Sequence, residues 1–371
     1  MNITQLQTPA IVLDLDRMER NIRRYHQAAH AHGKEVWPML KTHKSLEIAR
    51  MQADCGCTGF LCGTLDEAEA LCDAGFDNLM YAYPVSTAVN ARRVAALAKK
   101  CRFFVRLDDP DAARVLDRVA AEAGVTVNYT IIVDSGLHRF GVKPEKIRAF
   151  AEAMRQFSHL TLCGISTHPG QVYGAACRAD VERCCREERR AMAAAASALR
   201  EGGFAAELIT SGSTPTFFGA LEDENINICH PGNYVYHDVI QLSMEAACEE
   251  DCALSVLAAV ISHPSEDLFL CDAGSKCLGL DQGAHGGGSV RGFGRVVGHP
   301  ELTVSGLSEE VGKLHVDGPT TLQVGDLIRI IPNHSCSAAN LTSYYVGVRG
   351  DQVERLIAVD LRSNSTEKGF A

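Results

Sequence analysis

A lysine at the end of an apolar run is the first residue with a clear chemical prospect. Lys41 follows residues 37–40, which are Trp, Pro, Met and Leu. A lysine with a buried stem can act as an amine nucleophile, although most lysines lie on solvated faces. Lys44 is the rival. It leaves the expected strand three residues later, and we expect it to be the more exposed of the two.

Two short segments further along the chain have the composition of phosphate-binding loops. Small and hydroxyl residues leave backbone N–H groups accessible, and loops after late strands of a barrel often bind phosphate. Such residues also form ordinary surface turns. A nucleophilic lysine together with phosphate loops is the minimum equipment for pyridoxal 5′-phosphate (PLP). The residues are Ser211, Gly212, Ser213 and Thr214, and Gly232, Asn233 and Tyr234.

Three further side chains follow expected strands and could contact a cofactor ring. Arg139 could donate to the ring or its oxygen, or could be a surface arginine paired with an acid. His168 and Tyr173 could hold the ring face or its hydroxyl. All three are therefore candidates for cofactor binding.

His334 and Cys336 form the last candidate group. In an extended segment, residues two apart point to the same side. Imidazole and thiolate together favour Zn²⁺, while Mn²⁺ or Co²⁺ remain alternatives. A catalytic zinc normally has three protein ligands, so a third would lie elsewhere or be replaced by water or substrate. A buried cysteine can also be inert.

Apart from His334 and Cys336, these candidates lie after strands in a regular βα alternation. Eight such strands are typical of a TIM barrel, and the GxGxxG fingerprint of an open dinucleotide-binding sheet is missing. We therefore expect a (β/α)8 barrel. The strands are predicted at 36–41, 59–63, 78–83, 102–107, 127–133, 160–167, 206–211 and 225–229, and the helices at 15–32, 46–54, 65–74, 87–99, 110–123, 144–156 and 179–201.

After about residue 245 the pattern changes to short strands separated by turns. We expect a barrel domain over 8–245 and a mostly β domain over 246–371, with residues 1–7 able to pack on the latter. Glycines within 283–289 predict a loop. The strands are predicted at 253–262, 268–271, 292–297, 313–316, 327–331 and 344–349.

Composition narrows the function classes. The chain has 371 residues, with 46 acidic and 36 basic, and a formal charge of −10. This charge argues against nucleic acid as a partner. No apolar run reaches the roughly 18 residues of a membrane span, and we see no secretory signal. Fifteen cysteines without an export signal favour reduced thiols in a cytoplasm.

Seven segments, taken in order, resemble the metal-dependent D-serine dehydratase and D-threonine aldolase family. This family belongs to the alanine-racemase-like, fold-type III PLP enzymes. The resemblance runs from Thr8 to Cys336. The segments are KTHK at 41–44, DSGLHRFGV at 134–142, HPGQVYG at 168–174, GSTP at 212–215, HPGNY at 230–234, DAGSK at 272–276 and PNHSC at 332–336.

The resemblance implies a role for each candidate. Lys41 would form the Schiff base with PLP, the residues at 211–214 and 232–234 would hold its phosphate, and Arg139 and Tyr173 would lie near its ring. His334 and Cys336 would bind the metal beside the substrate hydroxyl. A homodimer is also implied, with the active site where one subunit's barrel meets the other's β domain.

The metal motif favours one reaction within this family. Its dehydratases carry His-x-Cys and its aldolases tend to carry His-x-Asp, so Cys336 favours elimination of water from a β-hydroxy D-amino acid, D-serine first. D-Threonine-aldolase-type cleavage is the nearest alternative. The remaining alternatives are a racemase, with Tyr344 or Tyr345 as a second base, and a non-catalytic PLP carrier. Residues 37–39 depart from the family's Arg-Pro-His, which leaves the substrate open.

Overall fold

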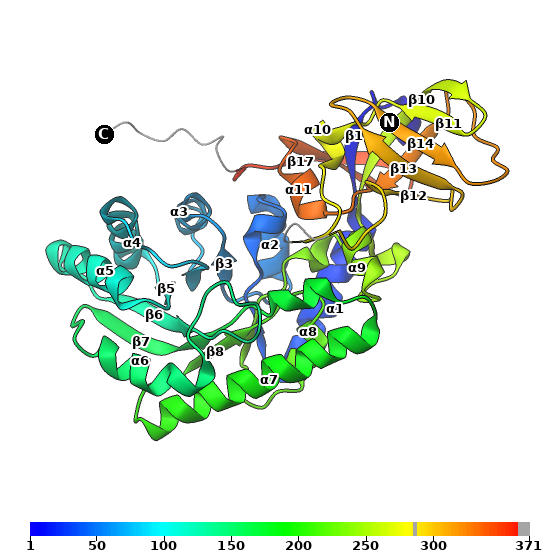
Figure 1. Cartoon of the computed structure of the whole chain (residues 1–371). Helices are drawn as coiled ribbons and strands as arrows, with labels where there is room; N and C mark the ends of the chain where they lie inside the picture. Colours follow the sequence, from blue (N-terminus) through cyan, green and yellow to red (C-terminus); the bar gives the residue numbers. More distant parts are fainter. Residues whose placement is uncertain (285–287, 363–371) are drawn as a thin grey trace.

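The structure is a computed structural model that describes residues 1–284 and 288–362. A barrel of strands and helices is joined to a β-rich domain that also holds the N-terminus (Figure 1). Of the glycine-rich loop predicted at 283–289, residues 285–287 lie outside the described residues.

The barrel sheet has eight parallel strands in the order β2-β9-β8-β7-β6-β5-β4-β3. A bridge between Met39 and Leu61 joins its two ends. The predicted barrel fold is therefore confirmed. The strands are β2 (Glu35–Val36), β3 (Phe60–Cys62), β4 (Leu79–Tyr81), β5 (Phe103–Leu107), β6 (Val127–Ile132), β7 (Leu160–Ser166), β8 (Leu208–Ser211) and β9 (Ile228–Cys229).

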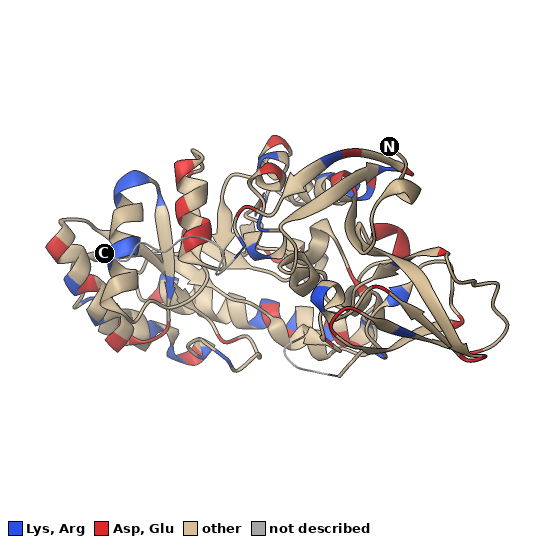
Figure 2. Ribbon diagram, turned by 90° about the horizontal axis from the view of Figure 1, so that it is seen from above, with Lys and Arg blue, Asp and Glu red and all other residues tan. Residues whose placement is uncertain are grey.

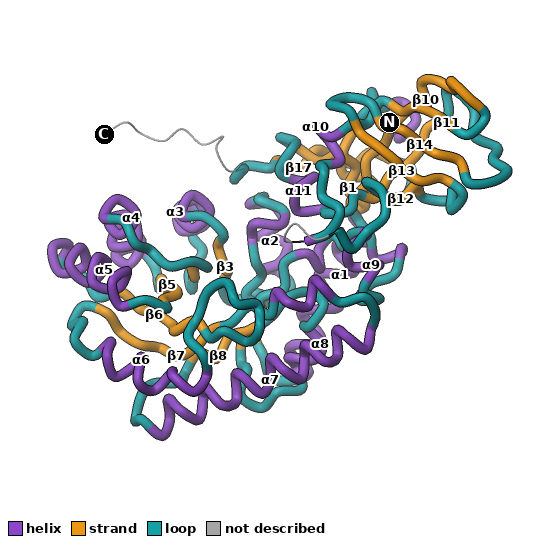
Figure 3. The backbone as a smooth tube through the Cα atoms, viewed as in Figure 1, coloured by secondary structure: helices purple, strands orange, loops and turns teal. Residues whose placement is uncertain are grey.

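Helices cover the outside of this sheet (Figure 3). Local signals fix their ends: α5 begins at Pro110, its N-cap Asp109 accepts hydrogen bonds from two backbone N–H groups, and Gly124, with φ 64°, caps its C-terminus after Ala123. The helices are α1 (Leu15–Ala31), α2 (Leu46–Asp54), α3 (Leu65–Asp73), α4 (Ala88–Lys100), α5 (Pro110–Ala123), α6 (Ile147–Met154), α7 (Arg178–Glu201) and α8 (Phe217–Leu221).

The first barrel strand is much shorter than predicted. We expected 36–41, whereas β2 ends at Val36 and residues Leu40–Thr42 form a 3-10 turn. Pro38 has no N–H to donate, so the ladder cannot continue through it. Only its carbonyl pairs, accepting from Leu61 N. The turn carries Lys41 away from the strand direction.

The second sheet has nine strands, and β13-β14-β11-β10-β1-β16-β17 is its main path. Its strands are β1 (Ala10–Asp14), β10 (Leu254–Ser265), β11 (Leu268–Cys271), β12 (Arg295–Val296), β13 (Leu302–Leu307), β14 (Gly312–Val316), β15 (Leu327–Ile331), β16 (Tyr344–Arg349) and β17 (Gln352–Ala358). Short helices α9 (Val239–Ser243), α10 (Ser275–Leu278) and α11 (Ser335–Ala339) accompany it.

The sequence patterns did not predict three strands of this sheet, β1, β13 and β17. Strand β1 lies between β10 and β16, pairing antiparallel with the first and parallel with the second. Its partners lie more than 200 residues away in the sequence, so no local periodicity announces the pairing. The start of the chain is thereby built into the β-rich sheet.

Lys and Arg are interspersed with Asp and Glu over both domains (Figure 2). In residues 1–284 and 288–362, no helix combines the length and apolar character that crossing a membrane requires.

Candidate active site

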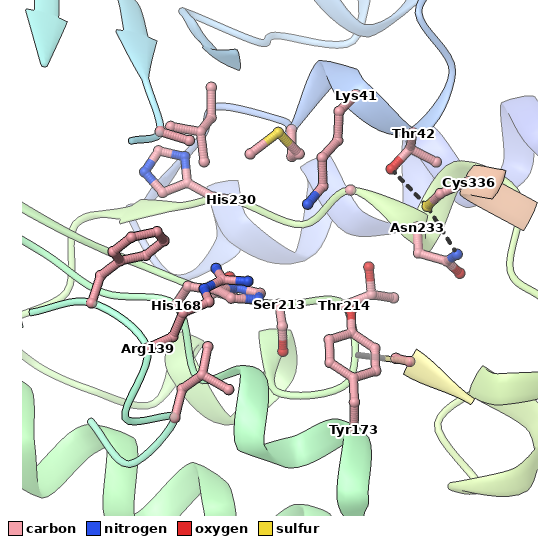
Figure 4. Close-up of a pocket in the computed structure, with 18 of the residues that line it drawn as sticks. Lys41, Thr42, Arg139, His168, Tyr173, Ser213, Thr214, His230, Asn233 and Cys336 are labelled. Atoms are coloured by element: carbon pink, nitrogen blue, oxygen red, sulfur yellow. Dashed lines mark hydrogen bonds between the residues drawn. The ribbon is translucent and has the colours of Figure 1, made fainter. Parts of the chain in front are cut away.

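One cavity of about 260 Å³ is lined by residues in or just after all eight barrel strands and by the segment after β15. Lys41 lies at its centre with the amine pointing inward, Cys336 and Asn233 lie to one side, and His230 lies to the other (Figure 4). Parallel barrels place their functional side chains at this end of the strands. The cavity is therefore the candidate site.

Most of the predicted site residues line this cavity: Lys41, Arg139, His168, Tyr173, Gly212, Ser213, Thr214, Gly232, Asn233, His334 and Cys336. Two do not. The Ser211 hydroxyl is buried and donates to Glu188, and the Tyr234 hydroxyl lies in the core against His26 and Gln52. Their side chains face away from the cavity.

The two lysines have the opposite exposure to the one predicted. Lys41 is exposed because the 3-10 turn points it into the open cavity. Lys44 is 7% exposed, and its amine lies 2.5 Å from Oε1 of the buried Glu67. The other Glu67 oxygen accepts from Gly63 N at 2.6 Å. Lys44 is thus part of a buried ion pair, and Lys41 is the lysine available to a ligand.

We expect Lys44→Met to destabilise the fold by about 3–5 kcal/mol, because it leaves the Glu67 carboxylate buried without its cation. Urea unfolding followed by circular dichroism measures the loss. The double variant Lys44→Met with Glu67→Leu should recover a large part of it, since no unpaired charge remains. A loss below about 1 kcal/mol in the single variant would contradict a buried ion pair.

Both small-residue loops need glycine where they approach their neighbours. A Cβ on Gly212, whose φ is 129°, would lie 3.0 Å from His230 N, and one on Gly232 would lie 2.9 Å from Thr42 Oγ1. The hydroxyls of Ser213 and Thr214 stand beside these glycines on the cavity wall. Close backbone and hydroxyl groups of this kind suit an anion such as phosphate.

Three buried polar atoms of cavity-lining residues have no hydrogen-bond partner among the described residues: His230 Nε2, Asn233 Oδ1 and Gln241 Oε1. His230 Nδ1 lies 2.8 Å from the Trp37 carbonyl, which can only accept, so Nδ1 carries the proton and Nε2 a lone pair. Burial holds the pKa of His230 well below its usual range. Unsatisfied buried groups are rare, and here they fit a polar ligand.

Arg106 on β5 adds a buried cation to the cavity wall. It is 4% exposed, and its guanidinium donates to Met80 Sδ at 3.3 Å and to Thr210 Oγ1 at 3.4 Å. Burial lowers its pKa to about 9. A guanidinium with such weak acceptors favours an anionic or electron-rich ligand nearby.

Arg139, His168 and Tyr173 occupy the lower wall of the view in Figure 4. The Arg139 guanidinium lies 5.1 Å from the Phe140 ring centroid. His168 Nδ1 lies 3.4 Å from the Gly212 carbonyl, which ties this wall to the small-residue loop. Burial raises the pKa of Tyr173, so its hydroxyl stays protonated at neutral pH.

His334 and Cys336 approach the cavity from the β-rich domain. His334 Nδ1 lies 3.3 Å from Asp281 Oδ1. Cys336 Sγ lies 3.4 Å from Thr42 Oγ1 and 3.6 Å from Asn233 Nδ2. Burial opposes the charged forms of both side chains, but the attraction between the His334 imidazolium and the Cys336 thiolate outweighs it. The pKa of Cys336 is therefore held below its usual value and the pKa of His334 well above its usual value. This pair offers one nitrogen and one sulfur donor.

The described residues contain no group of three or more His, Cys, Asp or Glu side chains arranged to hold a metal. A metal here would complete its coordination with water or substrate. Both donors line the cavity together with barrel residues of the same chain.

Sequence reasoning missed Asp238, which joins the two halves of the site. Its buried carboxylate accepts from Asn233 Nδ2 at 2.7 Å and from Ser335 N at 2.9 Å. Burial raises its pKa. Asp238 thus locks a barrel loop to the segment that carries His334 and Cys336. The only sequence signal is its place shortly after the HPGNY segment.

Comparisons with known proteins agree with this arrangement. Residues 13–239 match the family model "Alanine racemase, N-terminal domain", and residues 253–348 match "Putative serine dehydratase domain". D-threo-3-hydroxyaspartate dehydratase of Delftia sp. (strain HT23) is 30% identical over 93% of this chain and 95% of that protein. D-serine dehydratase of Dictyostelium discoideum is 26% identical over 94% of this chain and 95% of that protein.

A solved structure is similar over nearly its whole length. The crystal structure of D-threonine aldolase from Filomicrobium marinum has a TM-score of 0.89 and 26% identity, and the match covers 98% of this chain and 97% of that one. The first family model alone spans more than half of the chain. The chain therefore belongs to the D-serine dehydratase and D-threonine aldolase family of the alanine-racemase-like, fold-type III PLP enzymes.

Proposed function

We propose that this protein is a PLP- and metal-dependent lyase that eliminates water from a β-hydroxy D-amino acid to give a 2-oxo acid and ammonia. D-Serine is the leading candidate substrate. The observation that carries the proposal is the convergence of three features on one cavity. These features are the exposed amine of Lys41, the loops around Gly212 and Gly232, and the His334–Cys336 pair. Relatives that carry out dehydration support the same reading.

The residues present fit PLP. Lys41 Nζ would hold it covalently, and the hydroxyls of Ser213 and Thr214 with the backbone at Gly232 would bind its phosphate. Arg139, His168 and Tyr173 would border its ring. Bound PLP draws electron density away from the substrate Cα and so acidifies the Cα–H bond.

The chain's own groups would then move the proton and prepare the leaving group. Lys41 Nζ is the general base that takes the proton from Cα. His334 and Cys336 would hold a divalent ion, which supplies Lewis acidity to the β-hydroxyl, a poor leaving group without it. Asp281, bonded to His334 Nδ1, keeps Nε2 free to face the ion. The nitrogen and sulfur donors favour Zn²⁺, with Mn²⁺ or Co²⁺ as alternatives.

Product analysis tests the proposal. Purified protein is incubated with D-serine, D-threonine and 3-hydroxy-D-aspartate, with and without a chelator, and the products are identified. We expect 2-oxo acids and ammonia, with the yield lost on chelation. Glycine with an aldehyde product would instead establish retro-aldol cleavage, the reading that the likeness to the Filomicrobium marinum D-threonine aldolase favours. The L-enantiomer would mean a racemase, and no turnover would mean a PLP carrier.

A cytoplasmic location and a homodimer complete the proposal. The cysteine-rich composition supports the first, and the family resemblance supports the second. Light scattering of the purified protein measures its mass, and about twice the chain mass would support a homodimer.

A further inference from the structure

A buried carboxyl lies directly behind the loop that follows β8. Glu188 of α7 is 0% exposed, and its Oε1 accepts a hydrogen bond from the Ser211 hydroxyl. The Thr216 hydroxyl lies within hydrogen-bonding reach of the same carboxyl. Its Oε2 is buried and has no hydrogen-bond partner among the residues described. An orphan oxygen is far costlier on a buried carboxylate than on a neutral acid.

From this carboxyl a chain of hydroxyls leads to the cavity. Thr216 Oγ1 lies 3.1 Å from Ser213 Oγ, and Ser213 lines the cavity. All these side chains are buried: Ser211 and Thr216 are 0% and Ser213 is 3% exposed. Each hydroxyl has only one proton to donate. The direction of the hydrogen bond between Glu188 and Thr216 therefore fixes the direction of the hydrogen bond between Thr216 and Ser213.

The two charge states of Glu188 give opposite results at Ser213. An ionised Glu188 can only accept hydrogen bonds, so the Thr216 hydroxyl donates to it and the Ser213 hydroxyl donates to Thr216. Ser213 then faces the cavity with lone pairs. A neutral Glu188 donates to Thr216, Thr216 donates to Ser213, and the Ser213 proton is free to point into the cavity. Phosphate oxygens are acceptors, so only the second arrangement suits a phosphate ester.

We propose that Glu188 is a positioning residue that must be neutral for the cavity to bind the phosphate of PLP, because its proton orients the Thr216 and Ser213 hydroxyls toward the ligand. This inference rests on the proposed function, since it assumes that PLP occupies the cavity.

The surroundings of Glu188 agree with a neutral form near pH 7. Burial raises its pKa to about 7, although the hydrogen bonds with Ser211 and Thr216, which favour the ionised form, oppose the rise. Asp223 also raises the pKa and Arg189 lowers it. The other titratable groups that face it are Cys184 and Cys185 of α7 and Cys229 of β9. A raised pKa means that the proton is kept below about pH 7 and lost above it.

The consequence is proton uptake on binding. If the complex requires neutral Glu188, the affinity for PLP falls by up to about tenfold per pH unit above the pKa. Pyridoxal lacks the phosphate but can form the same bond with Lys41. The ratio of the two dissociation constants, pyridoxal over PLP, therefore isolates the phosphate site from the titration of the lysine.

The full-length protein, freed of PLP, is titrated with PLP and with pyridoxal between pH 6.5 and 9, and binding is followed by absorbance. For the wild type we expect the ratio to fall by about tenfold per unit above pH 7. Glu188→Gln keeps a donor and an acceptor without a titrating proton, so its ratio should be constant over this range. Glu187→Gln, on the same helix at a position whose side chain is 44% exposed, should behave as the wild type.

Ser213→Ala provides a second variant that does not disturb the buried carboxyl. It should weaken PLP binding by about tenfold at pH 6.5, leave pyridoxal binding unchanged and remove the pH dependence of the ratio. If this ratio has the same pH profile in the wild type and in Glu188→Gln, the inference about Glu188 is overturned, while the proposed function still stands. If the wild type binds neither compound, the proposed function fails and the inference fails with it.

Discussion

Replacing Lys41 by alanine should lower turnover at least about 10³-fold, because it removes the group that we propose as both the general base and the covalent anchor of PLP. The stability should stay within about 0.5 kcal/mol of the wild type. Lys41 is exposed in the cavity, so its loss leaves no void and no unpaired charge. Initial rates of 2-oxo acid release and the urea midpoint measure the two effects.

Borohydride reduction makes the assignment specific to one lysine. Reduction of the protein loaded with PLP should fix the cofactor to Lys41, located by peptide mass spectrometry. Lys44 is the matched control: Lys44→Met should lower stability but leave the label at Lys41. Label on Lys44, or full turnover by Lys41→Ala, would show that the wrong lysine has been identified.

The helices could be predicted from the sequence because their signals are local. The predicted ranges 46–54 and 110–123 coincide with α2 and α5, where Ser45 and Asp109 provide N-caps. The first strand could not be predicted in the same way. An apolar run through Pro38 reads as a strand, but the missing N–H ends the ladder. The error carried over to Lys41 and Lys44, whose exposures follow from the turn.

The residues of the site also fall into those that local sequence signals predict and those that they do not. The barrel motifs of the site lie after strands, so barrel geometry alone brings Lys41 and Gly212 to one end once the fold is known, whereas His334 comes from the β-rich domain. The residues that hold these motifs in place lack such a signal. Asp238 and Glu188 act through partners that only the folded chain brings near, and Asp281 lies 53 positions before His334. Residue type and local spacing do not reveal such pairs.

Cys336→Ala should abolish the dehydration of D-serine while leaving a different elimination largely intact. Hydroxide leaves poorly without a Lewis acid, and losing that assistance removes several kcal/mol, or at least about 10³-fold in rate. Chloride leaves unaided, so elimination from β-chloro-D-alanine should stay within about tenfold of the wild type. Chelation of the wild-type protein should reproduce both results, and assays of both substrates on each sample measure them.

Cys277→Ala is the matched control for this prediction. Cys277 is another half-buried thiol of the β-rich domain, hydrogen-bonded to the Gly274 carbonyl, and it lies outside the cavity lining. Its loss should leave both reactions unchanged. A two-donor metal also contributes little to folding compared with sheets of this size, so metal removal should leave the urea midpoint nearly constant. If chelation unfolds the protein or stops both substrates equally, the metal is structural, and if metal-free protein still dehydrates D-serine, His334 and Cys336 have no part in the departure of the hydroxyl.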